Sequence, residues 1–541
     1  MKAFIKFLDT NTTFLLLLFY PLLLLIILGF IYIPFLKIHI KEIAAFGFTI
    51  LLFAFPLIMV NNRFFRKFWA YLVVLVLSFL VVFKLSFYYH YGVRISASAL
   101  FVIFESNVEE TKSFLTDYFD LQTLLIISFG VFSLILLVSF KGVKKRFDFH
   151  LANRFSYSNK IVSLVLFSGI FFVANKRLQN ENILFITYNS FQDYTDYKEE
   201  LKSELNSKTS QFLNDVSKVA DRQTHVVIIG ESTSRRNMEL YGYDRATNPE
   251  LLKLKDELLV FRDVISPHTH TILSLDKILT LSDINEPNKS NNASLVQLAN
   301  MAGYKTYWLS NQRPIGLYES FVSIISNASD EQKFKTNENT DFKIYDTDLL
   351  PEFENYILDT ANKKVIFIHL SGTHSRYSSR YPYDYIYFTE TDYPSKYKNR
   401  KAKKIINEYD NAIRHNDYVV SEIIKIVKCK NVKSSVVYFS DHGDDVYWSQ
   451  NKNLGHNEYL ATMPMYEVPF ILWTSDKKMF DDLNTTNILS TPYHLEDFIH
   501  SFSDITGIKF EDYNTEKSIF SNDFKPKKRL IKNGIDYDSK N

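Results

Sequence analysis

The feature that most constrains this chain is a series of long apolar runs confined to its first 175 residues. A helix needs about 20 apolar residues to cross a bilayer, and the run FLLLLFYPLLLLIILGFIYIPFL is longer than that. It is too long and too aromatic for a cleaved signal peptide, and no small-residue cleavage site follows it. One such run could be a buried core helix, but five in succession predict a domain of five transmembrane helices over 1–175. The runs cover 14–36, 43–60, 68–89, 121–140 and 161–175.

The charged residues between these runs predict the orientation of the chain. Lysine and arginine gather before the first run, between the second and third, and between the fourth and fifth, at 2–6, 63–67 and 141–160. The segment 90–120 instead carries five acidic and two basic residues. Because basic connectors stay in the cytoplasm, we expect a multi-pass membrane protein with a cytoplasmic N-terminus. Five spans would place the remaining residues outside the cytoplasm, where a periplasmic or extracellular enzyme must take its transferred group from a lipid or another preformed donor rather than from ATP.

Beyond the membrane runs, the pattern changes to short apolar segments that alternate with longer amphipathic ones. Runs of this length, separated by helical stretches such as 403–428, predict an α/β domain with a largely parallel sheet that is covered on both faces. In such sheets the ligand lies beyond the carboxyl ends of the strands. The predicted strands cover 225–230, 305–311, 363–370, 434–443 and 468–474.

A connector and a tail flank this catalytic domain, which we place at 223–525. The connector, 176–222, carries four aromatic residues at helical spacing, suited either to the lipid–water boundary or to packing on the soluble domain, and then a polar helix. We expect 326–341 to be a polar loop and the basic tail 526–541 to be solvated. A formal charge of +2 gives no reason to expect a nucleic-acid partner, and a single cysteine, Cys429, excludes an intramolecular disulfide. We expect a monomer.

Acids and histidines follow three of the predicted strands at the point where each strand ends. Glu231 follows the first, His374 comes shortly after the third, and Asp441 and His442 follow the fourth. These side chains should therefore meet at one edge of the sheet. A carboxylate such as Glu231 is often only a helix cap, but an adjacent aspartate and histidine beside a second acidic strand end favour a metal. Imidazole and carboxylate suit zinc, whereas calcium would take more oxygens and no histidine.

The nucleophile should occupy the open position of such a zinc site, because zinc helps a bound hydroxyl to lose its proton. The loop VISPHTHTILSLDKILT (264–280) supplies hydroxyl groups in this part of the chain. The candidates are Ser266, Thr269, Thr271 and Ser274.

Five blocks of sequence, in order along the chain, resemble the membrane-bound phosphoethanolamine transferases of Gram-negative bacteria, members of the alkaline phosphatase and sulfatase superfamily. The resemblance covers essentially the whole chain. One block alone, such as SDHG, would be weak evidence, but five in the order of the family are strong. The blocks are GESTSRRNMELYGYDRATNP (230–249), SPHTHT (266–271), SGTHSRYSSRYP (371–382), SDHGDD (440–445) and LGHNEY (454–459).

The resemblance implies a role for each matching residue. Glu231, Asp441 and His442 would be zinc ligands, and Thr269 would be the nucleophile whose oxygen also contacts the metal. Thr271 is the alternative nucleophile, because only flanking similarity sets the register of this loop. His374 and His456 would hold the phosphoryl group and help to protonate the leaving oxygen. No role is assigned to His268, His270 or His369.

The resemblance also implies the reaction. The enzyme would transfer phosphoethanolamine from phosphatidylethanolamine, through a phosphothreonine intermediate, to lipid A or the lipooligosaccharide core, with a protein acceptor as a further option. Pro267-His268 replaces the Cys-Gly of the lipid-A-modifying members, and their disulfide cysteines are missing, which bears on the acceptor more than on the chemistry. The alternatives are a phosphoglycerol transferase, a sulfatase-like phosphohydrolase, and a membrane scaffold or transporter with a degenerate domain. Sparse charge within the spans disfavours a transporter.

Overall fold

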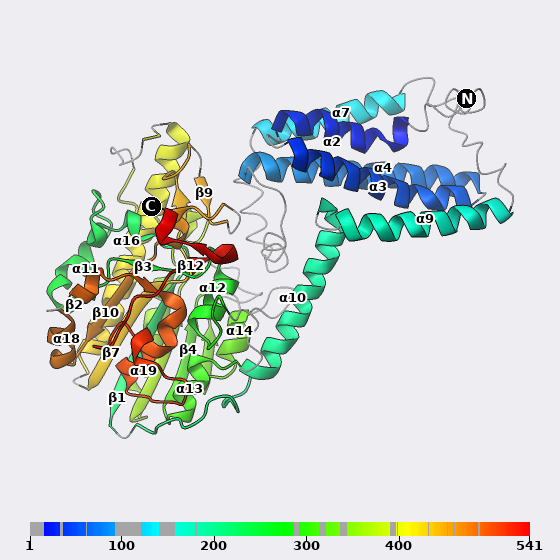
Figure 1. The fold of residues 1–541 in the computed structure, drawn as a ribbon. Helices are drawn as coiled ribbons and strands as arrows, with labels where there is room; N and C mark the ends of the chain where they lie inside the picture. The colour runs from blue at the N-terminus through cyan, green and yellow to red at the C-terminus, as the bar shows by residue number, and fades with distance from the viewer. Residues whose placement is uncertain are drawn as a thin grey trace. The chain divides into compact units, whose positions relative to one another are not determined.

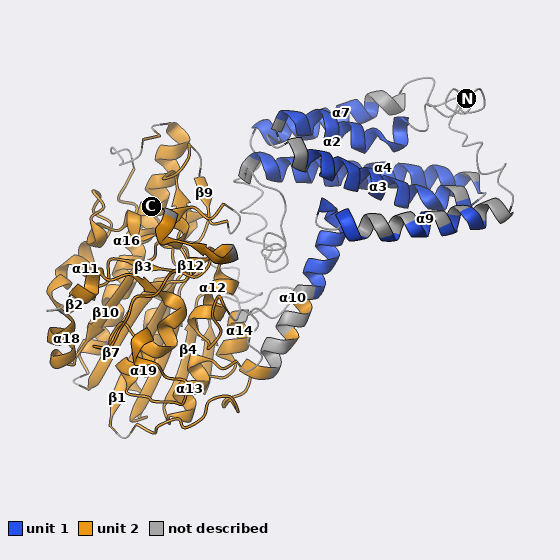
Figure 2. Ribbon diagram, in the orientation of Figure 1, with its two compact units in different colours: residues 1–194 blue, residues 195–541 orange. Residues whose placement is uncertain are grey.

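The structure, a computed structural model, consists of two compact units, residues 1–194 and 195–541 (Figure 2). The predicted connector, 176–222, straddles this division. The charged segments 2–6, 92–120 and 140–156 lie outside the described residues, so the orientation of the chain stays a prediction. The structure describes 16–32, 36–60, 62–91, 121–139, 157–178 and 181–541, apart from gaps at 220, 286–291, 313–320, 336–342, 390–395, 398, 431, 452, 458–459, 485–486 and 541.

Every apolar run of the first unit forms a helix where it is described. Two stretches, His39–Leu57 and Phe64–Tyr89, are long and apolar enough to cross a membrane by length and composition. The helices α2 and α7 contain shorter apolar stretches, Tyr20–Ile31 and Leu121–Ile135. A domain of five spans therefore stays a prediction. The helices are α2 (Tyr20–Tyr32), α3 (Leu36–Met59), α4 (Arg63–Tyr91), α7 (Leu121–Ser139), α9 (Tyr157–Leu178) and α10 (Ile183–Leu205).

An ion pair lies buried between two of these apolar helices, although the sequence suggested that charge there is sparse. The Nζ atom of Lys84 in α4 lies 2.9 Å from Oε1 of Glu42 in α3, and His39 Nδ1 lies 4.0 Å from the other carboxylate oxygen. Helix α2 meets the same group at Gly29, where an added Cβ would lie 2.1 Å from the His39 ring. This polar cluster therefore joins α2, α3 and α4.

We expect Lys84→Met to lower the midpoint of thermal unfolding of the full chain in detergent. The substitution leaves Glu42 buried without its cation, and breaking one partner of such a pair typically costs about 3–5 kcal/mol. The double variant Glu42→Gln/Lys84→Met removes both charges and should recover most of the loss. Intrinsic fluorescence during heating measures the three midpoints. Equal midpoints for the single and double variants would show that the pair carries no such energy.

The second unit is built on a seven-stranded sheet of order β2-β10-β7-β1-β6-β4-β5 (Figure 1). The strands β5, β4, β6, β1 and β7 run parallel to one another, while β10 is antiparallel to both of its neighbours. All five predicted strands are present, and the sheet is largely parallel but mixed. The strands are β1 (Gln223–Gly230), β2 (Leu258–Val260), β4 (Lys305–Ser310), β5 (Glu331–Phe334), β6 (Lys363–His369), β7 (Lys433–Ser440) and β10 (Phe470–Thr474).

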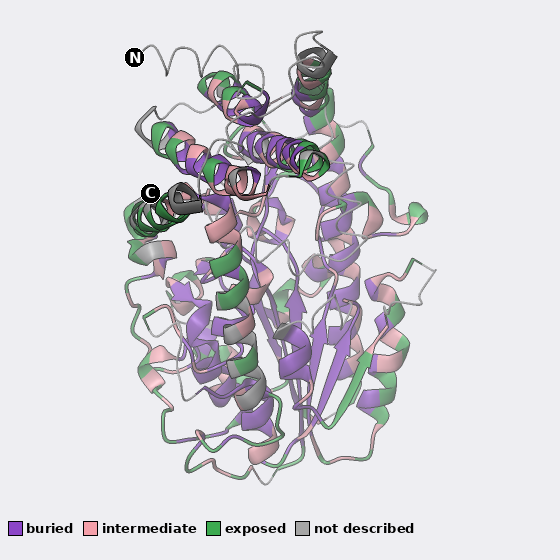
Figure 3. Ribbon diagram, turned by 90° about the vertical axis from the view of Figure 1, so that its right-hand side faces the viewer, coloured by how far each residue is buried: buried purple, intermediate pink, exposed green. Residues whose placement is uncertain are grey.

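Helices cover both faces of this sheet. Successive residues of a strand point to opposite sides, so each strand packs against one set of helices on each face. Val227, Phe367 and Phe439 face α12 (Thr271–Ile278), α13 (Leu295–Met301), α14 (Phe321–Ser326) and α19 (Phe498–Thr506). Their neighbours Val226, Ile366 and Tyr438 face α11 (Pro249–Lys253), α15 (Leu350–Leu358) and α16 (Arg400–Lys428). Figure 3 shows the sheet as the buried layer between them.

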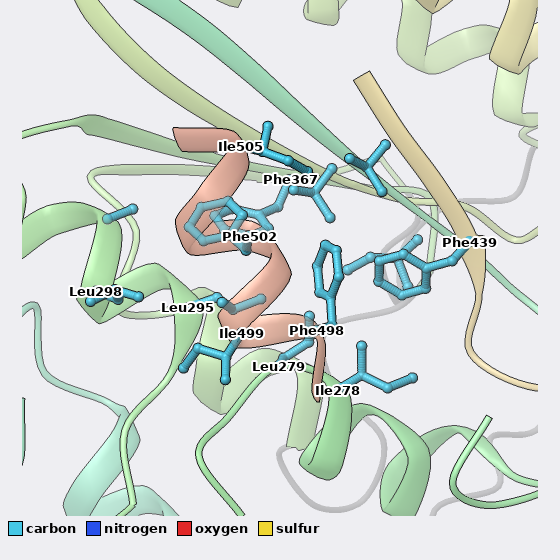
Figure 4. Packing of buried hydrophobic residues seen from close by; sticks show 14 of the residues in the cluster. Ile278, Leu279, Leu295, Leu298, Phe367, Phe439, Phe498, Ile499, Phe502 and Ile505 are labelled. Atoms are coloured by element: carbon cyan, nitrogen blue, oxygen red, sulfur yellow. The ribbon is translucent and has the colours of Figure 1, made fainter. Parts of the chain in front are cut away.

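Helix α19 illustrates how the sequence builds this packing. Phe498, Phe502 and Ile505 recur on one helical face and meet Phe367 and Phe439 of the sheet (Figure 4). The helix ends where Gly507 takes a left-handed conformation with φ of 73°. Fully burying one such phenylalanine contributes roughly 1.5–3 kcal/mol, so this face fixes one side of the domain.

Two segments differ from the sequence-based expectations. The predicted loop 326–341 contains the edge strand β5, whose residues are largely exposed and polar and so lack a strand-like apolar pattern. The predicted polar helix of the connector ends at Leu205, because the following residues pack along the domain instead: the amide of Ser217 donates to the carbonyl of Lys509 at 2.7 Å. The two alternatives for the aromatic residues of the connector, the lipid–water boundary and packing on the soluble domain, both stay predictions.

The tail that we expected to be solvated packs against the second unit. Arg529 is 2% exposed and donates to Asp263, with Nη1–Oδ1 at 2.7 Å, and also to Asp538. The Tyr537 hydroxyl, buried nearby, donates to Glu467 at 3.0 Å. The expectation of solvation was wrong for these two side chains, because their partners Asp263 and Glu467 lie 266 and 70 residues away in the sequence.

Candidate active site

Three neighbouring strands bring the predicted site segments to one edge of the sheet. In the parallel register, Gly230 of β1 pairs with Ser440 of β7, and Ile229 of β1 pairs with His369 of β6. The amide of Asp441 donates to the carbonyl of Gly230 at 3.1 Å, which continues the ladder past the strand ends. Residues that follow these strands are therefore adjacent, as the strand-end argument predicts.

Glu231, Asp441 and His442 converge beyond these strand ends. One ligand atom from each lies within 4.8 Å of the others. His442 Nε2 is 3.3 Å from a Glu231 oxygen and 3.5 Å from Asp441 Oδ2. All three side chains are at most 1% exposed. Two carboxylates and an imidazole are thus held together out of water.

This group fits a divalent metal ion. Asp441 Oδ2 is buried and has no hydrogen-bond partner among the described residues, whereas its Oδ1 accepts from the amides of His442 and Ser232. Burial, with the nearby charge of Glu231, raises the pKa of Asp441 to about 8. Although burial alone would lower the pKa of His442, the two carboxylates raise it to about 10. The metal-free cluster therefore retains protons that a cation would replace, and its donor set suits zinc.

Thr271 contacts this cluster through its hydroxyl, and the neighbouring Ser232 hydroxyl donates to the other Glu231 oxygen at 2.8 Å. Thr271 Oγ1 donates to Glu231 Oε2 at 3.1 Å and lies 3.5 Å from His442 Nε2. Thr271 begins α12 directly after the N-cap residue His270, so its hydroxyl lies where the partial positive charge of a helix start favours an anion. The sequence preferred Thr269 over Thr271. The hydrogen bond from Thr271 to Glu231 makes Thr271 the better-supported nucleophile, and the choice stays a prediction; Thr269 is fully buried.

The other two hydroxyl candidates, Ser266 and Ser274, form hydrogen bonds to each other and to the backbone. Ser266 Oγ donates to the carbonyl of Asp441 and bonds the hydroxyl of Ser274 at 2.9 Å. Ser274 in turn donates to the carbonyl of His268 at 3.0 Å. These bonds fasten the loop that precedes α12 to the segment that carries Asp441. Both serines are fully buried.

Two close backbone contacts hold Glu231 in place. Gly372 has φ of 49°, and an added Cβ would lie 2.7 Å from both the amide nitrogen and the carbonyl oxygen of Glu231. The next residue, Thr373, donates its amide to the carbonyl of Glu231 at 2.9 Å. On the other side, Ser232 takes a φ of 60° that non-glycine residues rarely adopt. The glycine after β6 therefore permits the close approach that positions Glu231.

We expect Gly372→Ala to reduce transfer activity by about 100-fold or more, because the new methyl group must displace the backbone of Glu231. Misplacement by about 1 Å can cost this much in rate. The matched control is Gly242→Ala, also at positive φ but with open space around its Cβ position. The rate of product formation and the bound metal per chain measure the effect. Equal activity in the two variants would contradict this role for Gly372.

A second set of polar residues lies beside the cluster, around the predicted phosphoryl-binding histidines. His456 Nδ1 bonds Asp444 Oδ1 at 2.8 Å, and Tyr377 donates to Asp444 Oδ2 at 2.7 Å. The ring centroids of His442 and His456 are 4.4 Å apart, and those of His374 and His456 are 6.0 Å apart. Burial lowers the pKa of His374 to about 4, so its ring is neutral near pH 7.

Sequence reasoning missed two residues of this site. Gln312 donates to Glu231 Oε2 at 3.1 Å and to the carbonyl of Leu370 at 2.9 Å. It directly follows the predicted strand 305–311, so the strand-end argument could have found it. Asp444 lies in the quoted SDHGDD block, but nothing in the block indicates that it orients His456.

The histidines without an assigned role lie in different surroundings. His369 ends β6 fully buried, with its ring 6.3 Å from that of Trp308, and burial lowers its pKa to about 4. His268 and His270 lie close together before α12, with ring centroids 6.4 Å apart.

Comparison with known proteins identifies the relatives of this arrangement. A family model described as Sulfatase matches residues 223–508. The phosphoethanolamine transferase EptC of Escherichia coli is 32% identical over 493 residues, which cover 84% of each chain. The crystal structure of the periplasmic domain of E. coli EptC in complex with Zn matches with a TM-score of 0.58 and 36% identity, over 60% of this chain and 96% of that one.

A second solved structure extends the likeness into the first unit. The integral membrane protein lipooligosaccharide phosphoethanolamine transferase A (EptA) of Neisseria meningitidis matches with a TM-score of 0.58 and 19% identity. The match covers 88% of this chain and 98% of that one. It shows that the apolar helices and the α/β unit share the fold of a membrane protein.

Proposed function

Because this chain belongs to the phosphoethanolamine transferases, with a sulfatase-family domain in its second unit, we propose that it transfers phosphoethanolamine from phosphatidylethanolamine to lipid A or the lipooligosaccharide core. One observation carries the proposal: the Thr271 hydroxyl contacts Glu231 and lies 3.5 Å from His442, within a buried group that suits a metal. The acceptor class comes from the names of the relatives.

The reaction would run in two displacements at phosphorus. In the first, Thr271 Oγ1 forms a bond to the phosphorus of the donor lipid, and the bond from phosphorus to the diacylglycerol oxygen breaks. The leaving oxygen takes a proton and departs as diacylglycerol. In the second, an acceptor oxygen attacks the same phosphorus, the bond to Thr271 breaks, and the threonine regains its proton. Splitting the transfer in this way gives two easier steps.

The surrounding residues would support both displacements. Glu231, Asp441 and His442 would hold a zinc ion, with the Thr271 hydroxyl beside them. Zinc would lower the pKa of that hydroxyl and offset charge on the phosphoryl oxygens. His456, oriented through Nδ1 by Asp444, is placed to give the leaving oxygen its proton, much as a fixed carboxylate orients a catalytic imidazole. The neutral ring of His374 would donate a hydrogen bond to the phosphoryl group.

The proposed location of the protein in the cell fits this chemistry. The donor is a bilayer lipid, and the first unit carries two helices long and apolar enough to cross a membrane. We propose an inner-membrane protein with a cytoplasmic N-terminus and the second unit in the periplasm. The lipid donor would also supply the transferred group where ATP is missing.

The test uses the full chain in detergent with zinc and a fluorescent phosphatidylethanolamine. We expect a burst of diacylglycerol close to one per enzyme without acceptor, and steady release once lipooligosaccharide or lipid A is added. Mass spectrometry should find phosphoethanolamine on the peptide that carries Thr271. Steady release of free phosphoethanolamine at the same rate without acceptor would instead establish a phosphohydrolase, the activity that the sulfatase-family match favours as second candidate.

A further inference from the structure

A cavity of about 670 Å³ in the second unit has no part in the mechanism above. Its walls come from three segments: residues just before α15, the turns η7 (Tyr377–Ser379) and η8 (Tyr383–Tyr385), and the first turns of α16. Cavities of this size hold small-molecule groups. Its chemistry indicates which group fits.

Positive charge gathers around this cavity. Lys343, Arg400, Lys403 and Lys404 line it, with Glu408 as the one carboxylate among the described lining residues. Lys404 and Glu408 lie 3.8 Å apart. Among the described residues, no carboxylate lies within ion-pair distance of the other three cations. An anion in the cavity would therefore meet three cations that have no ion-pair partner in the described part of the chain; Lys343 lies over the Tyr345 ring at 5.2 Å.

The position of these cations on α16 strengthens this reasoning. Arg400, Lys403 and Lys404 lie in the first turns of a helix that runs for 29 residues from Arg400. A helix start carries a partial positive charge, so cations there cost the helix a few tenths of a kcal/mol or more each. The Asn399 side chain caps the amide of Ala402, which brings no negative charge. A bound anion would relieve the repulsion among these groups.

Aromatic and amide groups complete the wall. Tyr345 and Tyr383 line the cavity, and Tyr383 is 89% exposed, so its ring offers a flat apolar face. Asn407 and Asn411 also line the cavity, and both are buried and donate to backbone carbonyls, those of Thr389 and Phe388. Flat rings beside cations and amides suit a sugar that bears phosphate, because ring faces accept its apolar side.

One segment links the cavity to the candidate active site. Tyr377 bonds Asp444, and Arg380 Nε donates to the carbonyl of His374 at 2.9 Å. Ser378 and Tyr381, from the same turn, line the cavity. The four residues from His374 to Ser378 span at most about 14 Å. A molecule in the cavity could therefore reach the phosphoryl site with a neighbouring part.

We propose that this cavity binds the phosphorylated saccharide of the acceptor, an inference that rests on the proposed transferase function. The donor is the poorer fit, because its headgroup carries an ammonium beside its phosphate and so has no net charge, whereas a phosphorylated saccharide is an anion. The cavity thus separates the two substrates by charge: the donor stays at the metal cluster, and the acceptor is held by its anionic sugar.

The test separates the two half-reactions in the full chain. The double variant Arg400→Glu/Lys403→Glu should keep the burst of diacylglycerol unchanged, since no acceptor takes part in it. Its KM for lipooligosaccharide or lipid A, each tested separately, should rise at least 10-fold, and Arg400→Lys/Lys403→Arg should restore most of the affinity. Lys477→Glu/Lys478→Glu is the matched control, with two exposed cations at the start of another helix, α18 (Lys477–Asn484).

The outcomes are distinct. An unchanged KM in the cavity variant overturns the cavity proposal while the transferase function stands. A lost burst in that variant also overturns it, because the cations would then act on the donor step. No burst in the parent chain means that the proposed function itself fails.

Discussion

Thr271→Ala should abolish transfer, lowering the rate by about 10,000-fold or more, whereas Thr269→Ala should retain most of it. Removing the atom that forms the covalent bond leaves only binding and electrostatic contributions to the rate, and losses of this size are typical for a nucleophile. The Thr271 hydroxyl, at the start of α12, donates to Glu231 Oε2 at 3.1 Å. Thr269 is fully buried, and we expect its loss to cost stability of about 1–2 kcal/mol rather than chemistry.

One measurement on three variants checks this contrast. Mass spectrometry of enzyme incubated with donor alone should find the phosphoethanolamine adduct in Thr269→Ala and none in Thr271→Ala. Thr271→Ser keeps the hydroxyl and should retain the adduct, which separates chemistry from folding. An adduct in Thr271→Ala, with none in Thr269→Ala, would restore the assignment that the sequence preferred.

The proximity of the three candidate metal ligands could be predicted because the rules that govern it act over short ranges. Alternation of apolar residues identifies the strands, and parallel strands end at one edge of a sheet. Glu231, Asp441 and His442 each follow such an end, so their proximity needs no further information. The structure places their ligand atoms within 4.8 Å. The same argument also covers Gln312.

The choice between the two threonines could not be made this way. They stand two residues apart in SPHTHT, with a histidine before each. What distinguishes them is where α12 begins, and helix ends are the least certain part of any sequence-based assignment. The start at Thr271 turns that hydroxyl toward the cluster.

The segments that the sequence misplaced depend on partners that are distant along the chain. The tail is held by Arg529 against Asp263, a pair separated by 266 residues. Strand β5 is polar and lies at the sheet edge, where pairing with β4 defines it rather than burial. The local sequence pattern does not indicate either contact. Tertiary context decides these elements.

Asp441→Asn should abolish zinc-dependent transfer, by about 1,000-fold or more, and should also remove the stabilisation that zinc brings. A metal that binds only the folded state stabilises it by about 4 kcal/mol at 1,000 times its Kd. We therefore expect zinc to raise the thermal midpoint of the parent chain and to leave that of the variant nearly unchanged. Metal analysis of the purified proteins should show zinc in the parent alone.

Without zinc, the thermal midpoint of the variant should equal that of the parent or exceed it. Without zinc, the parent buries the Asp441 carboxyl beside Glu231 with Oδ2 lacking a hydrogen-bond partner among the described residues. The asparagine amide can donate to Glu231, while its carbonyl keeps the bonds from the amides of Ser232 and His442. After chelation the variant should thus unfold at the same temperature as the parent or higher, because leaving a buried group unpaired costs about 1–3 kcal/mol. A metal-free variant that unfolds well below the metal-free parent would mean that Asp441 stabilises the fold itself, and the cluster would then be no metal site.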